Sequence, residues 1–211
     1  LRDKTIVGCE NVSFQINEGE FLVISGRSGS GKTQYLNVFI EHIYVLKEKY
    51  IINQGYRNVN LNKLSDNYIL EIRRREIGYL SQFFNPAPRV TAVDLVAEPL
   101  IYKNNSTYKE AKQKAIDLLK KLNISPDLFD AYPSTFSGGE QQRINIARAI
   151  IWKPRLLLLD EPTASLDDKN TSIVFELFKE LKREGTSIIG IFHDKDKKLV
   201  ERLADNFYIL D

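Results

Sequence analysis

Residues 21–33 read FLVISGRSGSGKT and combine an apolar run with a glycine-rich turn. The run Phe21–Ser25 is short and rich in β-formers, which predicts a buried strand that ends in a functional loop. Gly26–Thr33 fits the pattern G-x-x-x-x-G-K-[ST]. Residues 33–46, TQYLNVFIEHIYVL, are apolar on nearly every face and predict a buried helix that starts near Gly31. The stretch therefore predicts the strand–loop–helix unit in which this motif binds phosphate.

The residue types of this loop suit a phosphate chain. Glycines let successive backbone N–H groups converge on phosphate oxygens, and the N-terminus of the following helix adds positive potential. Lys32 supplies charge to the terminal phosphates, and Thr33 can ligate Mg²⁺. A Ser- and Gly-rich surface turn is the less favoured interpretation, because chance matches to this pattern are rare. We predict nucleoside triphosphate binding by Gly26, Arg27, Ser28, Gly29, Ser30, Gly31, Lys32 and Thr33.

Length and composition limit the class of protein. At roughly 150 residues per domain, 211 residues favour one compact domain with room for a subdomain. The chain is 43% hydrophobic and 27% charged, as expected of a folded globular protein. Thirty Lys and Arg against 28 Asp and Glu leave a net charge of +2, so no nucleic-acid partner is expected from charge. A single cysteine and the lack of a long apolar run disfavour a disulfide scaffold and a membrane span, and predict a cytoplasmic location.

Two continuous apolar runs, Leu156–Asp160 (LLLLD) and residues 187–192 (SIIGIF), are typical of buried parallel strands. The first run ends in the acidic pair Asp160 and Glu161. A carboxylate held at the end of a rigid strand can bind Mg²⁺, and a second acid can position or deprotonate a water. Alone, these acids would more often form a solvated strand end. Beside a phosphate-binding loop they predict a catalytic pair.

Helical patterns lie between the predicted strands. Residues 107–122 show helical spacing after a capping box of Thr107 and Glu110, and Ser137 with Glu140 predicts a second capped helix. Strands separated by helices indicate an α/β fold with a largely parallel sheet. The other predicted elements are strands at residues 77–81 and 207–210, a helix over 168–184, and surface turns over 53–75.

A second glycine turn, in residues 136–143 (FSGGEQQR), narrows the class. Ser-Gly-Gly at the start of a capped helix is a further anion-binding terminus within one chain. The stretch resembles the signature motif LSGGQ of ABC-type ATPases, with Phe136 in place of Leu and Glu140 in place of Gln. The rest of that family's pattern follows in order: Gln82 in the lid loop, Asp160-Glu161, Ser165-Leu166-Asp167, and His193 after SIIGIF.

The resemblance implies a fold and a set of cofactors. The fold is an ABC-type P-loop core with a largely parallel sheet, an antiparallel β edge and a helical signature subdomain. The whole chain forms a single domain, in which residues 1–82 and 151–211 are the nucleotide-binding core and residues 83–150 are the helical subdomain. The implied activity is ATP hydrolysis with ATP and Mg²⁺ as cofactors.

The resemblance also implies a head-to-tail dimer in which two subunits enclose the same ATP. The signature residues of one subunit would face the nucleotide held by the other, and they are Ser137, Gly138, Gly139 and Glu140. The implied catalytic residues are Glu161 as the base, His193 at the γ-phosphate, and Gln82 at the attacking water. Thr33, Gln82 and Asp160 would hold Mg²⁺, and Asp167 would cross the dimer interface.

The start of the sequence carries a separate expectation. The adenine-stacking aromatic of the family lies upstream of the strand that corresponds to residues 11–16, and Phe14 and Phe21 come too late for this role. No residue is therefore assigned to it. The sequence contains no methionine and begins at Leu1, so we expect a longer chain upstream.

Two branches of the family compete for this chain. Residues 81–101, 133–151, 156–170 and 188–194 look like the L-type ATP-binding subunit of the carbon–phosphorus lyase system, which acts in phosphonate breakdown with soluble lyase subunits. The alternative is a motor subunit of a membrane transporter, of the lipoprotein-release or a similar type. Its partner would be a transmembrane permease, and it would lie at the inner face of the membrane. Either branch implies a homodimer or a dimer with a related ABC ATPase.

A DNA-repair or chromosome-maintenance ATPase is a third class, and spacing disfavours it. Those proteins insert long coiled coils between the phosphate-binding loop and the signature motif. Here only 105 residues separate Lys32 from Ser137.

Overall fold

The apolar runs of the sequence form one parallel sheet. The computed structural model describes residues 16–26, 32–33, 51–54, 57–60, 65–82 and 84–210. Its five-stranded sheet has the order β4-β5-β6-β1-β7, and every neighbouring pair is parallel. The strands are β1 (Phe21–Gly26), β4 (Ile77–Leu80), β5 (Leu156–Asp160), β6 (Ser187–Ile191) and β7 (Asn206–Leu210). These bounds confirm the predicted strands to within one residue at each end.

Both faces of the central strands are buried. Alternate residues of β1, β5 and β6, such as Phe21, Leu157 and Ile188, enter the main hydrophobic core. The residues between them, such as Leu22 and Leu158, pack in a second cluster on the other face. A strand that is buried on both sides has no polar face, and this explains why these segments are continuous apolar runs.

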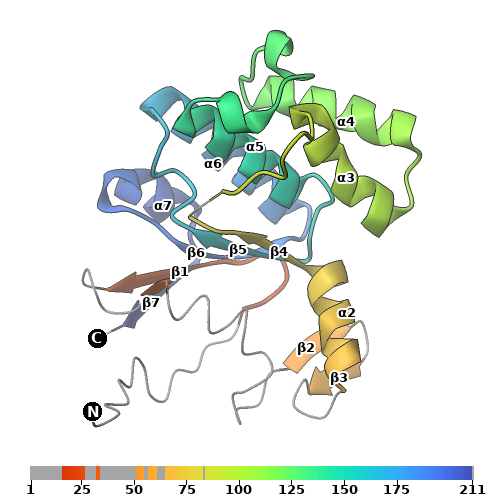
Figure 1. The fold of residues 1–211 in the computed structure, drawn as a ribbon. Coiled ribbons are helices and arrows are strands. Elements are labelled where there is room, and N and C mark those ends of the chain that lie inside the picture. Colours follow the sequence, from red (N-terminus) through yellow and green to blue (C-terminus); the bar gives the residue numbers. More distant parts are fainter. Residues whose placement is uncertain are drawn as a thin grey trace, which may run out of the picture.

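Most of the helices cover one face of the sheet (Figure 1). The helices α5 (Gly138–Ile150), α6 (Asp168–Arg183) and α7 (Lys197–Leu203) lie above the strands, and α3 (Ala92–Asn104) and α4 (Tyr108–Lys121) pack beyond α5. Short 3₁₀ turns, η2 (Pro126–Leu128), η3 (Pro133–Thr135) and η4 (Asp194–Asp196), connect these elements. The helix α2 (Asp66–Glu76) precedes β4 on the opposite side of the sheet.

The two predicted capping boxes are confirmed. Thr107 and Glu110 cap α4, and Ser137 and Glu140 cap α5, each with the reciprocal side-chain and backbone bonds of the motif. The signature turn therefore stands at a fixed helix start rather than in a loop.

The prediction of surface turns over residues 53–75 is wrong for most of that segment. It holds the antiparallel strands β2 (Ile51–Gln54) and β3 (Arg57–Asn60) and the helix α2. In α2, Ile72 is buried while Arg73–Arg75 occupy the last turn, so the apolar stripe is too narrow to give a clear helical period. Among the described residues, β2 and β3 pair as a two-stranded antiparallel sheet.

Besides α2, the helices α3 and α7 were not predicted. Helix α3 is apolar almost all round and contains Pro99, which usually marks the end of a helix. The predicted helix at 33–46, apart from residue 33, and the strand at 11–16, apart from residue 16, lie outside the described residues. The division into a core and a helical subdomain stays a prediction.

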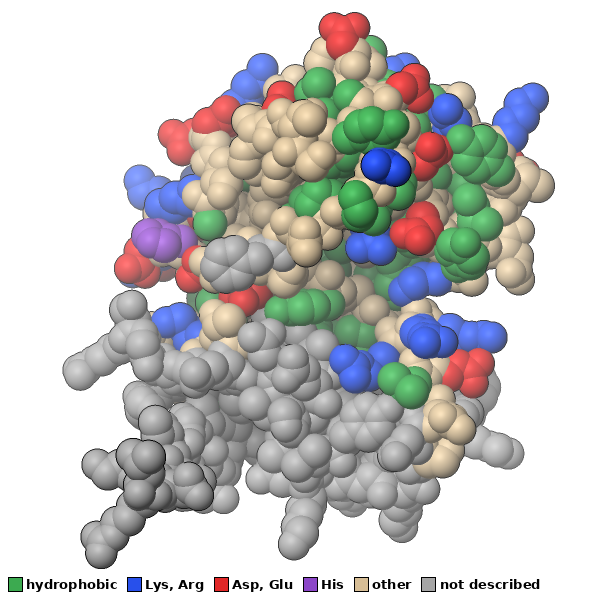
Figure 2. All heavy atoms as spheres, in the orientation of Figure 1, with side chains coloured by type: hydrophobic (Ala, Val, Ile, Leu, Met, Phe, Trp, Pro, Cys, Tyr) green, Lys and Arg blue, Asp and Glu red, His purple; other side chains and the backbone are tan. Residues whose placement is uncertain are grey.

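Acidic and basic side chains are intermixed on the described face of the helical layers (Figure 2). This agrees with the nearly balanced net charge of +2. In the parts of the chain that the structure describes, no helix combines the length and the apolar character that crossing a membrane requires.

The Lys103 ammonium, on α3, lies 3.4 Å from the centroid of the Trp152 ring. Burial of this side chain, with a smaller contribution from Arg148, lowers its pKa to about 8 from 10.5. Between these values the unfolded chain holds a proton that the folded chain has lost, so this group makes the protein more stable as pH rises through that window. We expect the ¹³C resonance of Lys103 Cε to titrate near pH 8, and a midpoint near 10.5 would contradict the burial argument.

Candidate functional site

The predicted catalytic residues follow the carboxyl ends of neighbouring strands. Gly26 ends β1, Gln82 follows β4, Asp160 ends β5, and His193 follows β6. All these strands are parallel, so their carboxyl ends lie at one edge of the sheet. In open α/β sheets this edge is where ligands bind.

The two ends of the phosphate-binding motif are held together. The Lys32 ammonium donates a hydrogen bond to the Gly26 carbonyl oxygen at 2.8 Å. Thr33 Oγ1 donates to Asp160 Oδ1 at 3.1 Å, which joins the motif to the end of β5. The predicted contacts Arg27, Ser28, Gly29, Ser30 and Gly31 lie outside the described residues.

Asp160 is a buried carboxylate beside a hydroxyl. Its exposed fraction is 1%, and burial is the main cause that raises its pKa; the neighbouring Glu161 raises it further, while the Thr33 hydrogen bond acts in the opposite direction. A bound cation would stabilise the ionised form of such a group. Among the described residues no set of three His, Cys, Asp or Glu could hold a metal alone. Two oxygen donors suit Mg²⁺, because this ion usually takes few protein ligands and completes its shell with water and phosphate oxygens.

Glu161 has an unusual backbone conformation. Its φ of 47° lies in the left-handed region, which non-glycine residues adopt at an energetic cost. Its N–H donates to the Ile191 carbonyl of β6 at 3.0 Å, and this bond helps hold the conformation. Gln82 Nε2 donates to Glu161 Oε2 at 3.3 Å. The carboxylate thus meets the residue predicted to contact the attacking water.

The signature turn is closed by its own capping box. Ser137 Oγ donates to Glu140 Oε2 at 2.6 Å, and the Ser137 N–H donates to the same oxygen at 2.9 Å. The hydrogen bonds from Ser137 lower the Glu140 pKa. A Cβ added at Gly139 would lie 3.0 Å from the Ser165 carbonyl oxygen, whereas one added at Gly138 would meet no atom of the described residues within 4 Å. A side chain at Gly139 would therefore press on the backbone of the described fold, and one at Gly138 would not.

Asp167 and His193 have local partners. Asp167 caps α6 and accepts hydrogen bonds from the Asn170 backbone N–H at 2.7 Å and from Asn170 Nδ2 at 2.9 Å. His193 is exposed, and its Nδ1 accepts from the Lys195 N–H at 3.4 Å. Within the described part of the chain, no hydrogen bond joins these residues or the signature turn to Thr33, Asp160, Glu161 or Gln82. Hydrogen bonds thus join Thr33 to Asp160 and Gln82 to Glu161, whereas Ser137, Asp167 and His193 bond to neighbours in their own segments.

Sequence reasoning missed the residues that brace these groups. Gln142 Nε2 donates to the Pro162 carbonyl at 2.8 Å and so ties α5 to the loop after Glu161. Arg143 Nη1 donates to Asn170 Oδ1 at 2.8 Å, beside the cap of α6. Both side chains are buried polar groups on the inner face of α5. Their place in the predicted helix after Ser137 was a usable signal, because one face of such a helix packs on the core.

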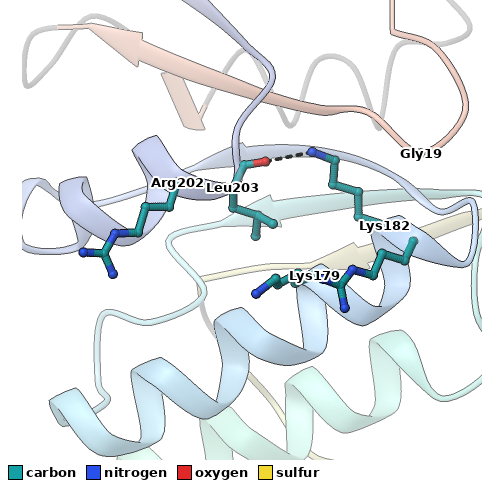
Figure 3. Close-up of a pocket in the computed structure, with 6 residues that line it drawn as sticks. Gly19, Lys179, Lys182, Arg202 and Leu203 are labelled. Atoms are coloured by element: carbon teal, nitrogen blue, oxygen red, sulfur yellow. Dashed lines mark hydrogen bonds between the residues drawn. The ribbon is translucent and has the colours of Figure 1, made fainter.

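A basic surface pocket lies away from this edge of the sheet (Figure 3). It has a volume of about 330 Å³ and is lined by Gly19, Lys179, Lys182, Arg183, Arg202 and Leu203. Lys182 Nζ donates to the Leu203 carbonyl at 3.0 Å and to Asp205 Oδ1 at 2.7 Å. Lys182 and Arg183 lie in the last turn of α6, where they stabilise the helix dipole, and Arg202 lies in the last turn of α7. Asp167 is at the opposite, N-terminal end of α6. The pocket is therefore separate from the site.

Comparison with known proteins identifies the family. The family model described as "ABC transporter" matches residues 9–164. The uncharacterized ABC transporter ATP-binding protein YvrO of Bacillus subtilis is 38% identical over 187 residues, which cover 89% of this chain and 79% of that protein. The lipoprotein-releasing system ATP-binding protein LolD of Buchnera aphidicola is 38% identical over 194 residues, which cover 91% of this chain and 82% of that protein.

A solved structure is also similar along the whole chain. It is the dimeric post-hydrolysis state of the ATP-binding cassette MJ0796 of Methanocaldococcus jannaschii, bound to ADP and Pi. The TM-score is 0.82 at 31% identity, with 100% of this chain and 89% of that chain covered. The expected fold is thereby confirmed. This chain belongs to the ABC transporter family and is an ATP-binding, ATP-hydrolysing cassette of that family.

Proposed function

We propose that this chain is the nucleotide-binding motor subunit of a membrane transporter of the lipoprotein-release or a similar type. The observation that carries the proposal is its 38% identity to LolD along 91% of its length. The name of that relative states a lipoprotein-releasing system. The partner of this chain would be a transmembrane permease, and the chain would lie at the inner face of the membrane.

The carbon–phosphorus lyase branch is the second candidate. It rests on the wording FSGGEQQR and IFHD in residues 136–143 and 191–194. YvrO is described as an ABC transporter ATP-binding protein and LolD as the ATP-binding protein of a lipoprotein-releasing system. Both descriptions favour the motor subunit. The two candidates share the ATP site and differ in the partner, so a test must identify the partner.

The geometry supports a hydrolytic site at the end of the sheet. Thr33 and Asp160 would hold Mg²⁺ with Gln82 nearby, and the ion would neutralise charge on the phosphate oxygens. Glu161 would accept the proton of the attacking water, because its carboxylate is held by the strained backbone and by Gln82. His193 would contact the γ-phosphate from the end of β6.

The signature turn would act on the nucleotide of a second subunit. Gly138 supports this role, since no atom of the described residues lies within 4 Å of the Cβ that a larger residue would have there. Ser137, Gly139 and Glu140 would complete this surface at the N-terminus of α5, which favours anions. The similar MJ0796 structure is a dimer. We therefore propose a head-to-tail dimer, with Asp167 at its interface.

Site-directed photo-crosslinking would identify the partner. In ABC transporter motor subunits the loop after the Gln82 position would dock on the permease, so we propose this segment as the contact, and Ala87 within it is exposed. A photoreactive amino acid at Ala87 is expected to capture a membrane-embedded permease in native membranes. The same group at exposed Arg183, beside the basic pocket, is the matched control. Capture of soluble lyase subunits from Ala87 would reject the motor proposal in favour of the second candidate.

A further inference from the structure

The loop Thr163–Leu166 connects the catalytic strand β5 to α6 and leaves several carbonyl groups outside regular structure. The Lys195 ammonium donates hydrogen bonds to the Thr163 carbonyl at 2.9 Å, to the Ala164 carbonyl at 3.2 Å and to the Leu166 carbonyl at 3.2 Å. An ammonium group has three N–H donors, and each finds an acceptor in this loop. A single side chain from η4, just after β6, thus holds the loop by three of its carbonyl groups.

A buried hydrogen bond strengthens this connection. Thr163 and Asp196 are exposed by only 1% and 4%, and Thr163 Oγ1 donates to Asp196 Oδ2. Asp196 follows Lys195 directly, and the Lys195 N–H in turn donates to His193 Nδ1. The segment that carries His193 is therefore joined to the loop after Glu161 by two successive residues, Lys195 and Asp196.

The opposite side of the same loop contacts the signature helix. The Ser165 carbonyl lies against Gly139, and the Pro162 carbonyl accepts from Gln142. The loop is thus held between α5 on one side and the segment of Lys195 on the other. A displacement of this loop would change the positions of Glu161 before it and Asp167 after it.

We propose that Lys195 is a positioning residue for ATP hydrolysis. It holds the Thr163–Leu166 loop against the His193 segment, so that the carboxylate of Glu161 and the imidazole of His193 keep their relative positions at the nucleotide. The inference rests on the ATPase activity of the family and on the roles proposed above for Glu161 and His193. It does not depend on which partner the cassette drives.

The test compares Lys195→Met with Lys198→Met in the full chain. Lys198 is exposed on α7 and, among the described residues, makes no hydrogen bond with the loop, so it controls for the loss of one surface charge. We expect Lys195→Met to lower kcat for ATP about tenfold, the order expected of a small displacement of catalytic groups. KM should change by less than about twofold, because the nucleotide-binding loop is untouched. Hydrogen exchange of the amides of residues 164–167 should accelerate in this variant alone.

Lys195→Arg provides a second variant. A planar guanidinium cannot direct its donors at three converging carbonyls as an ammonium does, so we expect an intermediate kcat. Unchanged kcat in Lys195→Met would overturn the proposal, as would a fall in Tm with kcat and KM altered together. If the parent chain hydrolyses no ATP, the ATPase roles fail. Faster exchange at residues 164–167 would then still show that Lys195 holds the loop, and unchanged exchange would overturn that as well.

Discussion

Glu161→Gln will abolish ATP turnover and trap the ATP-bound dimer. A general base of this kind contributes about 10² to 10⁴ in rate. The amide of Gln has the shape of the carboxylate but cannot accept the proton of the attacking water. The variant keeps the left-handed backbone at this position and a polar partner for Gln82, so nucleotide binding should be retained. Phosphate release at saturating Mg-ATP, with light scattering to measure mass, checks both parts.

The matched control is Glu176→Gln. Glu176 is an exposed carboxylate on α6 whose pairing with Lys179, at 3.5 Å, is weak. It should hydrolyse ATP at the parent rate and show no trapped dimer. Turnover at the parent rate in Glu161→Gln would show that another group is the base.

The strand framework and the helix starts were predictable because their causes are local in sequence. A strand buried on both faces must be apolar at every position, as in Leu156–Leu159, and a capping box needs only Ser137 and Glu140 three residues apart. The pairing of Thr33 with Asp160 was predictable as well, since their motifs are recognised separately and both lie at the ends of parallel strands.

The missed features have causes that are distant in sequence. Helix α3 is stabilised by burial on nearly all sides, so Pro99 is tolerated although its local signal indicates a break. Lys195 looks like one of many surface lysines, and only the fold brings carbonyls from about 30 residues earlier to its ammonium. Gly138 and Gly139 cannot be distinguished by residue type in the sequence. Their environments differ only in the fold, which brings the Ser165 carbonyl oxygen close to Gly139.

That difference makes Gly138→Asp the most informative change at the signature turn. The fold should accept it, because a Cβ at Gly138 meets no atom of the described residues within 4 Å and an acid in the first turn of α5 is favourable for the helix dipole. In the proposed dimer the new carboxylate would face the partner's γ-phosphate and repel it. We expect unchanged Tm and unchanged ATP binding by the monomer, with loss of ATP-dependent dimerisation and a fall in turnover of about 100-fold or more.

Two companion variants separate charge from shape. Gly138→Asn has nearly the shape of Gly138→Asp without its charge, so it should retain more activity if repulsion is the cause. Gly139→Ala should instead lower stability by about 1 kcal/mol, because its Cβ would press on the Ser165 carbonyl at 3.0 Å. If Gly138→Asp still dimerises with Mg-ATP, the signature turn does not face a second nucleotide and the head-to-tail arrangement is wrong. If both Gly138 variants unfold the chain, the fold has no room for a side chain at this position, and the glycine serves the fold rather than the dimer.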